Sequence, residues 1–78
     1  MPARKPDGGS VLRRLGDAVV RRRILAGKTQ EAVAESASLS VQFLRRVERG
    51  TGNPSYLTLC AISAALGAAL EDIVREAR

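Results

Sequence analysis

Residues 29–54, TQEAVAESASLSVQFLRRVERGTGNP, decide the fold of this chain. Small apolar residues such as Val33 mark one face of a helix predicted over residues 30–37, where another helix can cross closely. A turn around Ser38 follows, and then a second helix, predicted over residues 41–49. Two short helices joined by a tight turn are typical of a helix-turn-helix.

The second helix of this pair has one apolar face and one polar, basic face. Ser40 is a suitable N-cap for it, and Gly50 is a suitable end. Leu44 and Val47 face the core. The outward residues are Val41, Gln42, Arg45, Arg46 and Arg49. Such a face suits the major groove of DNA, which is wide enough to admit a helix.

Three further helices are expected, because apolar residues recur at helical spacing on either side of this region. They are predicted over residues 11–26, 56–66 and 70–77. Ser10 and Ser55 are the expected N-caps of the first two, and residues 1–10 are expected to form a flexible basic arm. We therefore expect an all-α domain of five helices over residues 11–78.

Composition excludes several classes of protein. Lys and Arg number 13 against 8 Asp and Glu, which gives a net charge of +5 and favours a polyanionic partner such as double-stranded DNA. One cysteine and no histidine argue against an internal disulfide and a zinc site, and we expect no metal, cofactor or catalytic residue. No run has the length of a membrane span and no signal peptide is evident, so we expect a cytoplasmic protein without membrane contact.

Short motifs along the chain occur in order at the spacing of a known family. They are Leu15-Gly16, Arg23, Gly27, Thr29-Gln30-Glu31, Ala34, Leu39-Ser40, Leu44, Val47-Glu48-Arg49-Gly50, Asn53-Pro54-Ser55, Leu59, Ile62 and Leu66-Gly67. In these residues the chain resembles the lambda-repressor-like, or Xre-type, helix-turn-helix regulators. The resemblance covers residues 15–74 and implies a compact five-helix DNA-binding domain.

The resemblance also implies a role for each matching position. Val41, Gln42 and Arg46 hold positions that reach base edges, where Gln42 suits adenine and Arg46 suits guanine. Contacts to the sugar-phosphate backbone are implied for Gln30, Ser40, Phe43, Arg49, Asn53 and Ser55. Arg45, on the same helix face, is expected to contact DNA or to remain in solvent.

Two further positions are implied to be structural, and three depart from the family pattern. Arg23 and Glu48 match a partly buried ion pair between the first and third helices. Ser38 stands where a glycine with a left-handed backbone is usual, at a cost of about 1 kcal/mol. Lys28 stands where an aliphatic residue is common, and Ala69 stands where a capping residue is common.

The last two helices carry more apolar residues than the core of so small a domain needs. We expect Leu57, Leu70, Ile73 and Val74 to form a homodimer interface that sets two recognition helices about 34 Å apart. Ile73→Asp would then give monomers that bind DNA weakly.

We expect a sequence-specific transcriptional regulator, similar in size to restriction-modification controller proteins, that binds a near-palindromic operator. It would block or recruit RNA polymerase, and the short remainder after the fifth helix leaves no room for a sensor domain. The alternative is a protein-interaction module, such as an antitoxin that uses the same DNA-binding domain. The genes beside its own would distinguish the two.

Overall fold

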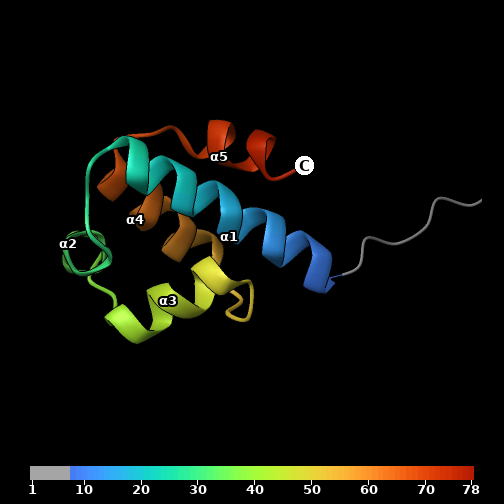
Figure 1. The fold of residues 1–78 in the computed structure, drawn as a ribbon, viewed down its shortest axis with the longest axis horizontal. Coiled ribbons are helices and arrows are strands. Elements are labelled where there is room, and N and C mark those ends of the chain that lie inside the picture. The colour runs from blue at the N-terminus through green and yellow to red at the C-terminus, as the bar shows by residue number, and fades with distance from the viewer. Residues whose placement is uncertain (1–7) are drawn as a thin grey trace, which may run out of the picture.

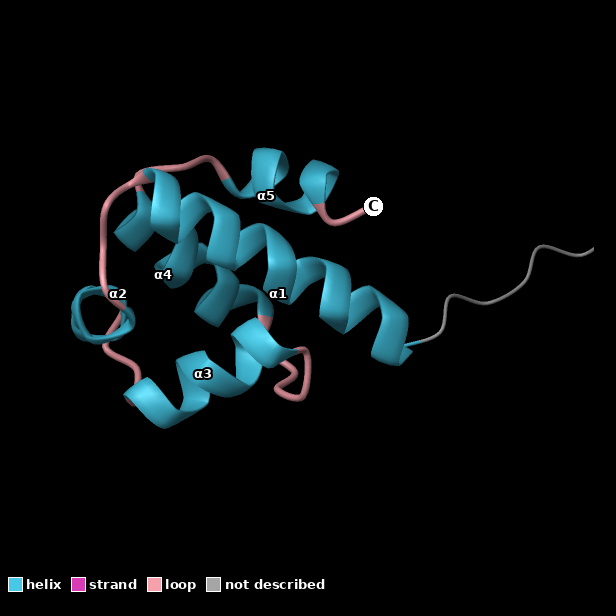
Figure 2. Cartoon of the chain, viewed as in Figure 1, coloured by secondary structure: helices cyan, strands magenta, loops and turns pink. Residues whose placement is uncertain are grey.

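The structure, a computed structural model, describes residues 8–78, and this part of the chain contains five helices and no strand (Figure 2). The helices are α1 (Gly8–Leu25), α2 (Gln30–Ser36), α3 (Val41–Arg49), α4 (Tyr56–Leu66) and α5 (Leu70–Glu76). In Figure 1, α1 runs along the molecule with α5 on one side and α2 and α3 on the other. The all-α fold of five helices is confirmed. The remainder of the expected arm, residues 1–7, lies outside the described residues.

The helix ends follow local capping chemistry. The hydroxyls of Thr29, Ser40 and Ser55 accept hydrogen bonds from backbone N–H groups two or three residues into α2, α3 and α4. Gly50 and Gly67 end α3 and α4 in the left-handed backbone conformation. The ends at Ser40, Gly50 and Ser55 match the sequence predictions, because each depends on residues within one turn.

The start of α1 was predicted wrongly. The helix begins at Gly8, three residues before the expected Val11, so Ser10 lies inside the helix instead of capping it. The Ser10 hydroxyl instead accepts a hydrogen bond of 2.8 Å from Nη1 of Arg14, one turn later. Because the Ser10 hydroxyl is bonded to Arg14, it is less free to bond to nearby backbone groups and so disturbs the helix less.

The turn between α2 and α3 has the predicted left-handed residue. Ser38 has a φ of 57°, and it is the one non-glycine with a positive φ among the described residues. Its backbone N–H donates to the carbonyl of Glu35, and the N–H of Leu39 donates to the carbonyl of Ala34 at 2.8 Å. The turn therefore closes α2 tightly and directs the chain into α3.

The core lies where α1, α3, α4 and α5 meet, and α2 closes one end. Its fully buried large residues are Val19, Val33, Leu44, Val47, Ile62 and Ile73. The axes of α1 and α3 approach closely at Gly16, since a Cβ atom there would lie 2.5 Å from the carbonyl oxygen of Val47. A glycine at this position therefore sets how α3 sits on the rest of the domain.

α5 is fixed against α1 by apolar and polar contacts. Ile73 is 1% exposed and belongs to the core, so its expected place in a dimer interface is wrong. The period of α5 indicates an apolar stripe, but only packing shows that the Ile73 side chain lies inside the core. Nε of Arg22 donates to Glu76 at 2.9 Å, and this hydrogen bond holds the pKa of the Glu76 carboxyl below its usual value.

Within residues 8–78, no single helix has both the length and the apolar character needed to cross a membrane. Only the bent pair α4 and α5, which meet at 101°, has that length and composition together.

Candidate nucleic-acid interface

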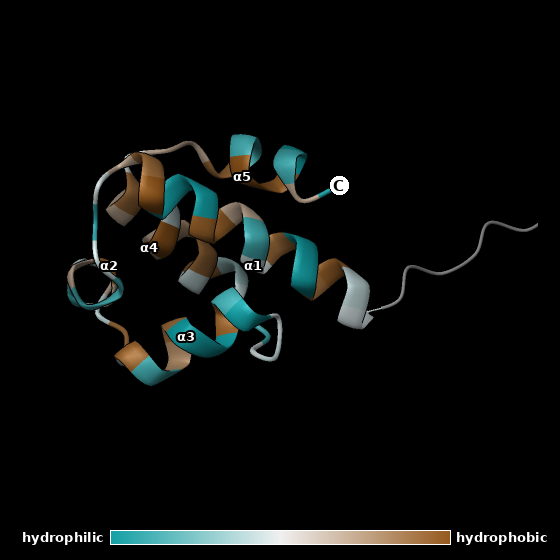
Figure 3. Cartoon of the chain, in the orientation of Figure 1, coloured by the Kyte–Doolittle hydropathy of each residue, from teal (hydrophilic) through white to brown (hydrophobic). Residues whose placement is uncertain are grey.

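The outer face of α3 is polar and basic, and it has four exposed side chains. They are Gln42, Arg45, Arg46 and Arg49. Hydrophilic and hydrophobic positions alternate along this helix in Figure 3, because Leu44 and Val47 are buried beneath the exposed face. The predicted two-faced character of α3 is confirmed.

Two residues of α3 lie deeper than the exposed face. One is Val41, which was predicted to point outward, and the other is Phe43, for which the resemblance implies a contact to the sugar-phosphate backbone. Val41 and Phe43 are half-buried and pack against the core, at the end of α3 that follows the turn. Each therefore exposes only part of its side chain at the edge of the face. Only the exposed apolar part of each side chain, at the edge of the α3 face, is open to contact with a ligand.

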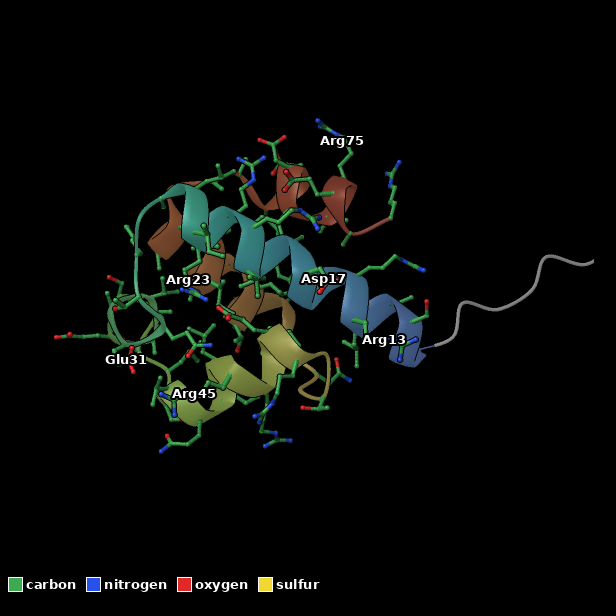
Figure 4. The ribbon with its side chains drawn as sticks, in the orientation of Figure 1. Arg13, Asp17, Arg23, Glu31, Arg45 and Arg75 are labelled. Atoms are coloured by element: carbon green, nitrogen blue, oxygen red, sulfur yellow. The ribbon has the colours of Figure 1, made fainter. Side chains whose placement is uncertain are left out.

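An ion pair joins α1 to α3 behind this face, at the position implied by the resemblance. Arg23 donates to Glu48 through Nε at 2.8 Å and through Nη2 at 3.1 Å. The Glu48 side chain is 5% exposed, and that of Arg23 is 17% exposed. In Figure 4 the Arg23 side chain extends from α1 toward α2 and α3. Because both donors lie on one edge of the guanidinium, the pair fixes α3 in orientation as well as in distance.

The same carboxylate also holds the first residue of α2. Nε2 of Gln30 donates to Oε1 of Glu48 at 2.9 Å, and Oε1 of Gln30 accepts from Nε of Arg45 at 3.2 Å. Nη2 of Arg45 donates to Oε2 of Glu31 at 3.2 Å. Arg45 is therefore tied to α2, and Figure 4 shows it with Glu31 on the side where α2 and α3 meet. The sequence alone indicates no role for Glu31, because no local signal connects it with a residue 14 positions away.

The other three polar side chains of the face have no hydrogen-bond partner within the described residues, and we call them uncommitted. Within the described residues, Gln42, Arg46 and Arg49 make no side-chain hydrogen bond to the protein. Arg46 also contributes its backbone carbonyl to the loop that follows, where it accepts from the N–H groups of Thr51 and Gly52. This loop brings the exposed Asn53 and Ser55 next to the end of α3.

Polar groups at the edges of the face have structural partners as well. The Ser40 hydroxyl accepts from the N–H of Phe43 at 3.1 Å, and that of Ser55 accepts from the N–H of Thr58 at 3.1 Å.

Lys28, which departs from the family pattern, donates through Nζ to the carbonyl of Ala65 at 2.6 Å. Its partner explains the departure, because the cation satisfies a carbonyl in the last turn of α4.

α4 and α5 each carry an exposed apolar side chain. Leu57 is 78% exposed, and Val74 is 44% exposed. Val74 also lines a groove of about 350 Å³ between the start of α1, α4 and the end of α5. Of the four residues expected at a dimer interface, Leu57 and Val74 are exposed, Leu70 is half-buried and Ile73 is buried.

Comparison with known proteins gives consistent results. A family model described as helix-turn-helix matches residues 20–73. The HTH-type transcriptional regulator y4dJ of Sinorhizobium fredii is 38% identical over 60 residues, which cover 77% of this chain and 78% of that protein.

Solved structures of similar proteins have the same fold. The clp gene regulator ClgR of Corynebacterium glutamicum is 32% identical with a TM-score of 0.83, over 94% of this chain and 91% of its own. The restriction-modification controller protein C.AhdI of Aeromonas hydrophila is 26% identical with a TM-score of 0.78, over 80% of this chain and 94% of its own. The chain thus belongs to the helix-turn-helix family, and it is a DNA-binding transcriptional regulator of the Xre-like, lambda-repressor-like type and not an enzyme.

Proposed function

We propose that this regulator binds a near-palindromic operator as a homodimer and places α3 of each subunit in the major groove. The observation that carries the proposal is the uncommitted state of Gln42, Arg46 and Arg49 on an otherwise well-bonded surface. Side chains that are exposed and without protein partners have donors available for a ligand. Base edges and phosphates are the ligands that suit these donors.

Each contact follows from the chemistry and place of its residue. Arg46, in the last turns of α3, donates two bonds to guanine, and Gln42 pairs with adenine. Val41 contacts a thymine methyl from the edge of the face, which agrees with its half-buried position. The backbone contacts surround the helix and are made by Gln30, Ser40, Phe43, Arg49, Asn53 and Ser55.

The dimer is formed through the apolar surface of α4 and α5, with Leu57 and Val74 at its centre. A domain of this size gains stability from association, and two copies related by a two-fold axis present two recognition helices to one operator. Bound in the cytoplasm beside a promoter, such a dimer blocks or recruits RNA polymerase. The likeness to a restriction-modification controller protein supports this arrangement.

Fluorescence anisotropy at several salt concentrations tests the binding proposal. The protein is titrated with the duplex upstream of its own gene and with a random duplex. We expect Arg46→Ala to weaken binding to the specific duplex by about 1–3 kcal/mol and to remove most of the preference. Arg21→Ala is the control, because it removes the same charge from an exposed position close to Glu76 of α5. Equal loss in both variants would contradict base recognition by Arg46.

Sedimentation velocity tests the dimer. Leu57→Asp places a charge at the centre of the proposed interface and is expected to give folded monomers. Leu25→Asp is the control, because it makes the same change at an 81% exposed leucine in the last turn of α1, outside the proposed interface. It is expected to leave the dimer intact. A dimeric Leu57→Asp variant would show that the subunits meet elsewhere.

A further inference from the structure

We propose that Arg45 is a positioning residue that orients Gln30, and that Glu31 holds it in that role and away from DNA phosphates. The proposal rests on the proposed function, since an oriented Gln30 matters only when α3 occupies the groove. It assigns the three arginines of α3 different tasks, although the sequence places them on one exposed face.

The first step is the geometry of the Gln30 side chain. Its oxygen accepts from Arg45 at 3.2 Å, and its nitrogen donates to the Glu48 carboxylate at 2.9 Å. Turning the amide over would set the oxygen against the Glu48 carboxylate and the N–H₂ group against a guanidinium, which are two repulsive contacts. The amide therefore has one orientation, and its second N–H is left to donate to a phosphate.

The second step concerns what holds Arg45. Its Nε and Nη2 lie on one edge of the guanidinium, and they donate to Gln30 and to Glu31, each at 3.2 Å. The side chains of Arg45 and Glu31 are 44% and 66% exposed, so the pair lies at the protein surface, where a phosphate can reach it. Without Glu31, the guanidinium would keep only a neutral acceptor, and a phosphate would be the stronger partner.

The third step is the effect on salt dependence. Each phosphate neutralised by a protein cation steepens the fall of binding with salt by about 0.9 in a plot of log K against log salt. A guanidinium that is already paired with Glu31 neutralises no phosphate and so does not contribute to that slope. The double variant Glu31→Ala/Arg45→Ala removes this neutral pair without freeing the Glu31 carboxylate. It is therefore expected to leave the slope unchanged and to weaken binding about 2- to 10-fold, which is the range for one hydrogen bond.

Coupling to Gln30 is the second readout. If Arg45 acts through Gln30, the triple variant Gln30→Ala/Glu31→Ala/Arg45→Ala, which frees no carboxylate, binds no more weakly than Gln30→Ala alone. A purely structural loss would instead lower the melting temperature and would add to the Gln30 effect. Thermal melting of each variant separates these two results.

Glu31→Ala tests the tether directly. With the carboxylate removed, Arg45 becomes available to phosphate, and the salt slope is expected to steepen by about 0.9. Glu35→Ala is the matched control, because Glu35 lies one turn further along α2, is exposed and forms no ion pair within residues 8–78. The double variant Glu31→Ala/Arg45→Ala should return the slope to that of Glu35→Ala.

The outcomes distinguish the two proposals. A shallower slope in Glu31→Ala/Arg45→Ala than in Glu35→Ala means that Arg45 contacts phosphate itself, and this overturns the positioning role. Equal slopes in Glu31→Ala and Glu35→Ala overturn the tether. A triple variant that binds more weakly than Gln30→Ala overturns the coupling. Failure of the unmodified protein to bind any duplex at low salt would instead overturn the proposed function, and this inference with it.

Discussion

The close contact of α1 and α3 at Gly16 makes a quantitative prediction about stability. In Gly16→Ala the added methyl carbon would lie 2.5 Å and 2.6 Å from the carbonyl oxygens of Val47 and Glu48. A carbon and an oxygen in ordinary contact are about 3.3 Å apart, so the two helices must separate by about 0.8 Å. The atoms that must move belong to the backbone and not to the end of a flexible side chain. Overpacking of this kind costs about 1–3 kcal/mol, and the better helix propensity of alanine returns up to about 1 kcal/mol.

We therefore expect Gly16→Ala to lose roughly 1–2 kcal/mol, or about 5–15 °C in melting temperature for a domain of this size. Thermal and urea melts followed by circular dichroism measure the change. Gly8→Ala is the control, because it lies in the same helix and its added methyl would meet no atom within 4 Å. A Gly16→Ala variant as stable as Gly8→Ala would refute the reasoning, since it would mean that α1 and α3 do not meet as described.

Three other changes test the packing and the polar contacts. Glu48→Ala should destabilise the domain by about 3 kcal/mol in urea melts, because Arg23 would be left largely buried without its carboxylate; an effect below about 1 kcal/mol would contradict this. Ile73→Ala should lose about 2–5 kcal/mol at any protein concentration, whereas a loss that vanishes on dilution would return this residue to an interface. The lowered pKa of Glu76 adds stability above the usual carboxyl pKa of about 4.3, and this stability is lost as the pH falls through the lower folded value. Glu76→Gln should abolish that part of the acid dependence of melting, and an unchanged acid profile would exclude the Arg22 contact as its source.

The fold was predictable from the sequence because its signals are local. The bounds of α3 and α4 match the prediction, since a serine cap and a terminal glycine lie within one turn of each end. The strained backbone of Ser38 was predictable from its place in the family pattern. The start of α1 was not, because Ser10 can either cap a helix or bond to Arg14 within one, and a single residue type does not separate these states.

The candidate site was predictable only in part, because its remaining features depend on tertiary packing. Helical period places Arg45, Arg46 and Arg49 on one exposed face and gives no reason to separate them. The packing of α2 against α3 brings Glu31 and Gln30 to Arg45 alone. Likewise, the period of α5 cannot show that Ile73 is buried in the core while Val74 remains at the surface.

These findings give a physical reason why an acidic residue at the first turn of α2 is compatible with binding to a polyanion. A free carboxylate beside the phosphates would weaken association, but Glu31 carries its charge as one half of a pair with Arg45. The pair is neutral as a whole and keeps a flexible guanidinium from bonding to any phosphate that it can reach. Attraction that depends only on phosphates is then reduced, while the donors of Gln42 and Arg46 stay available for bases. On the proposed function, discrimination between sequences therefore depends on how many cations the protein withholds from DNA as well as on how many it presents.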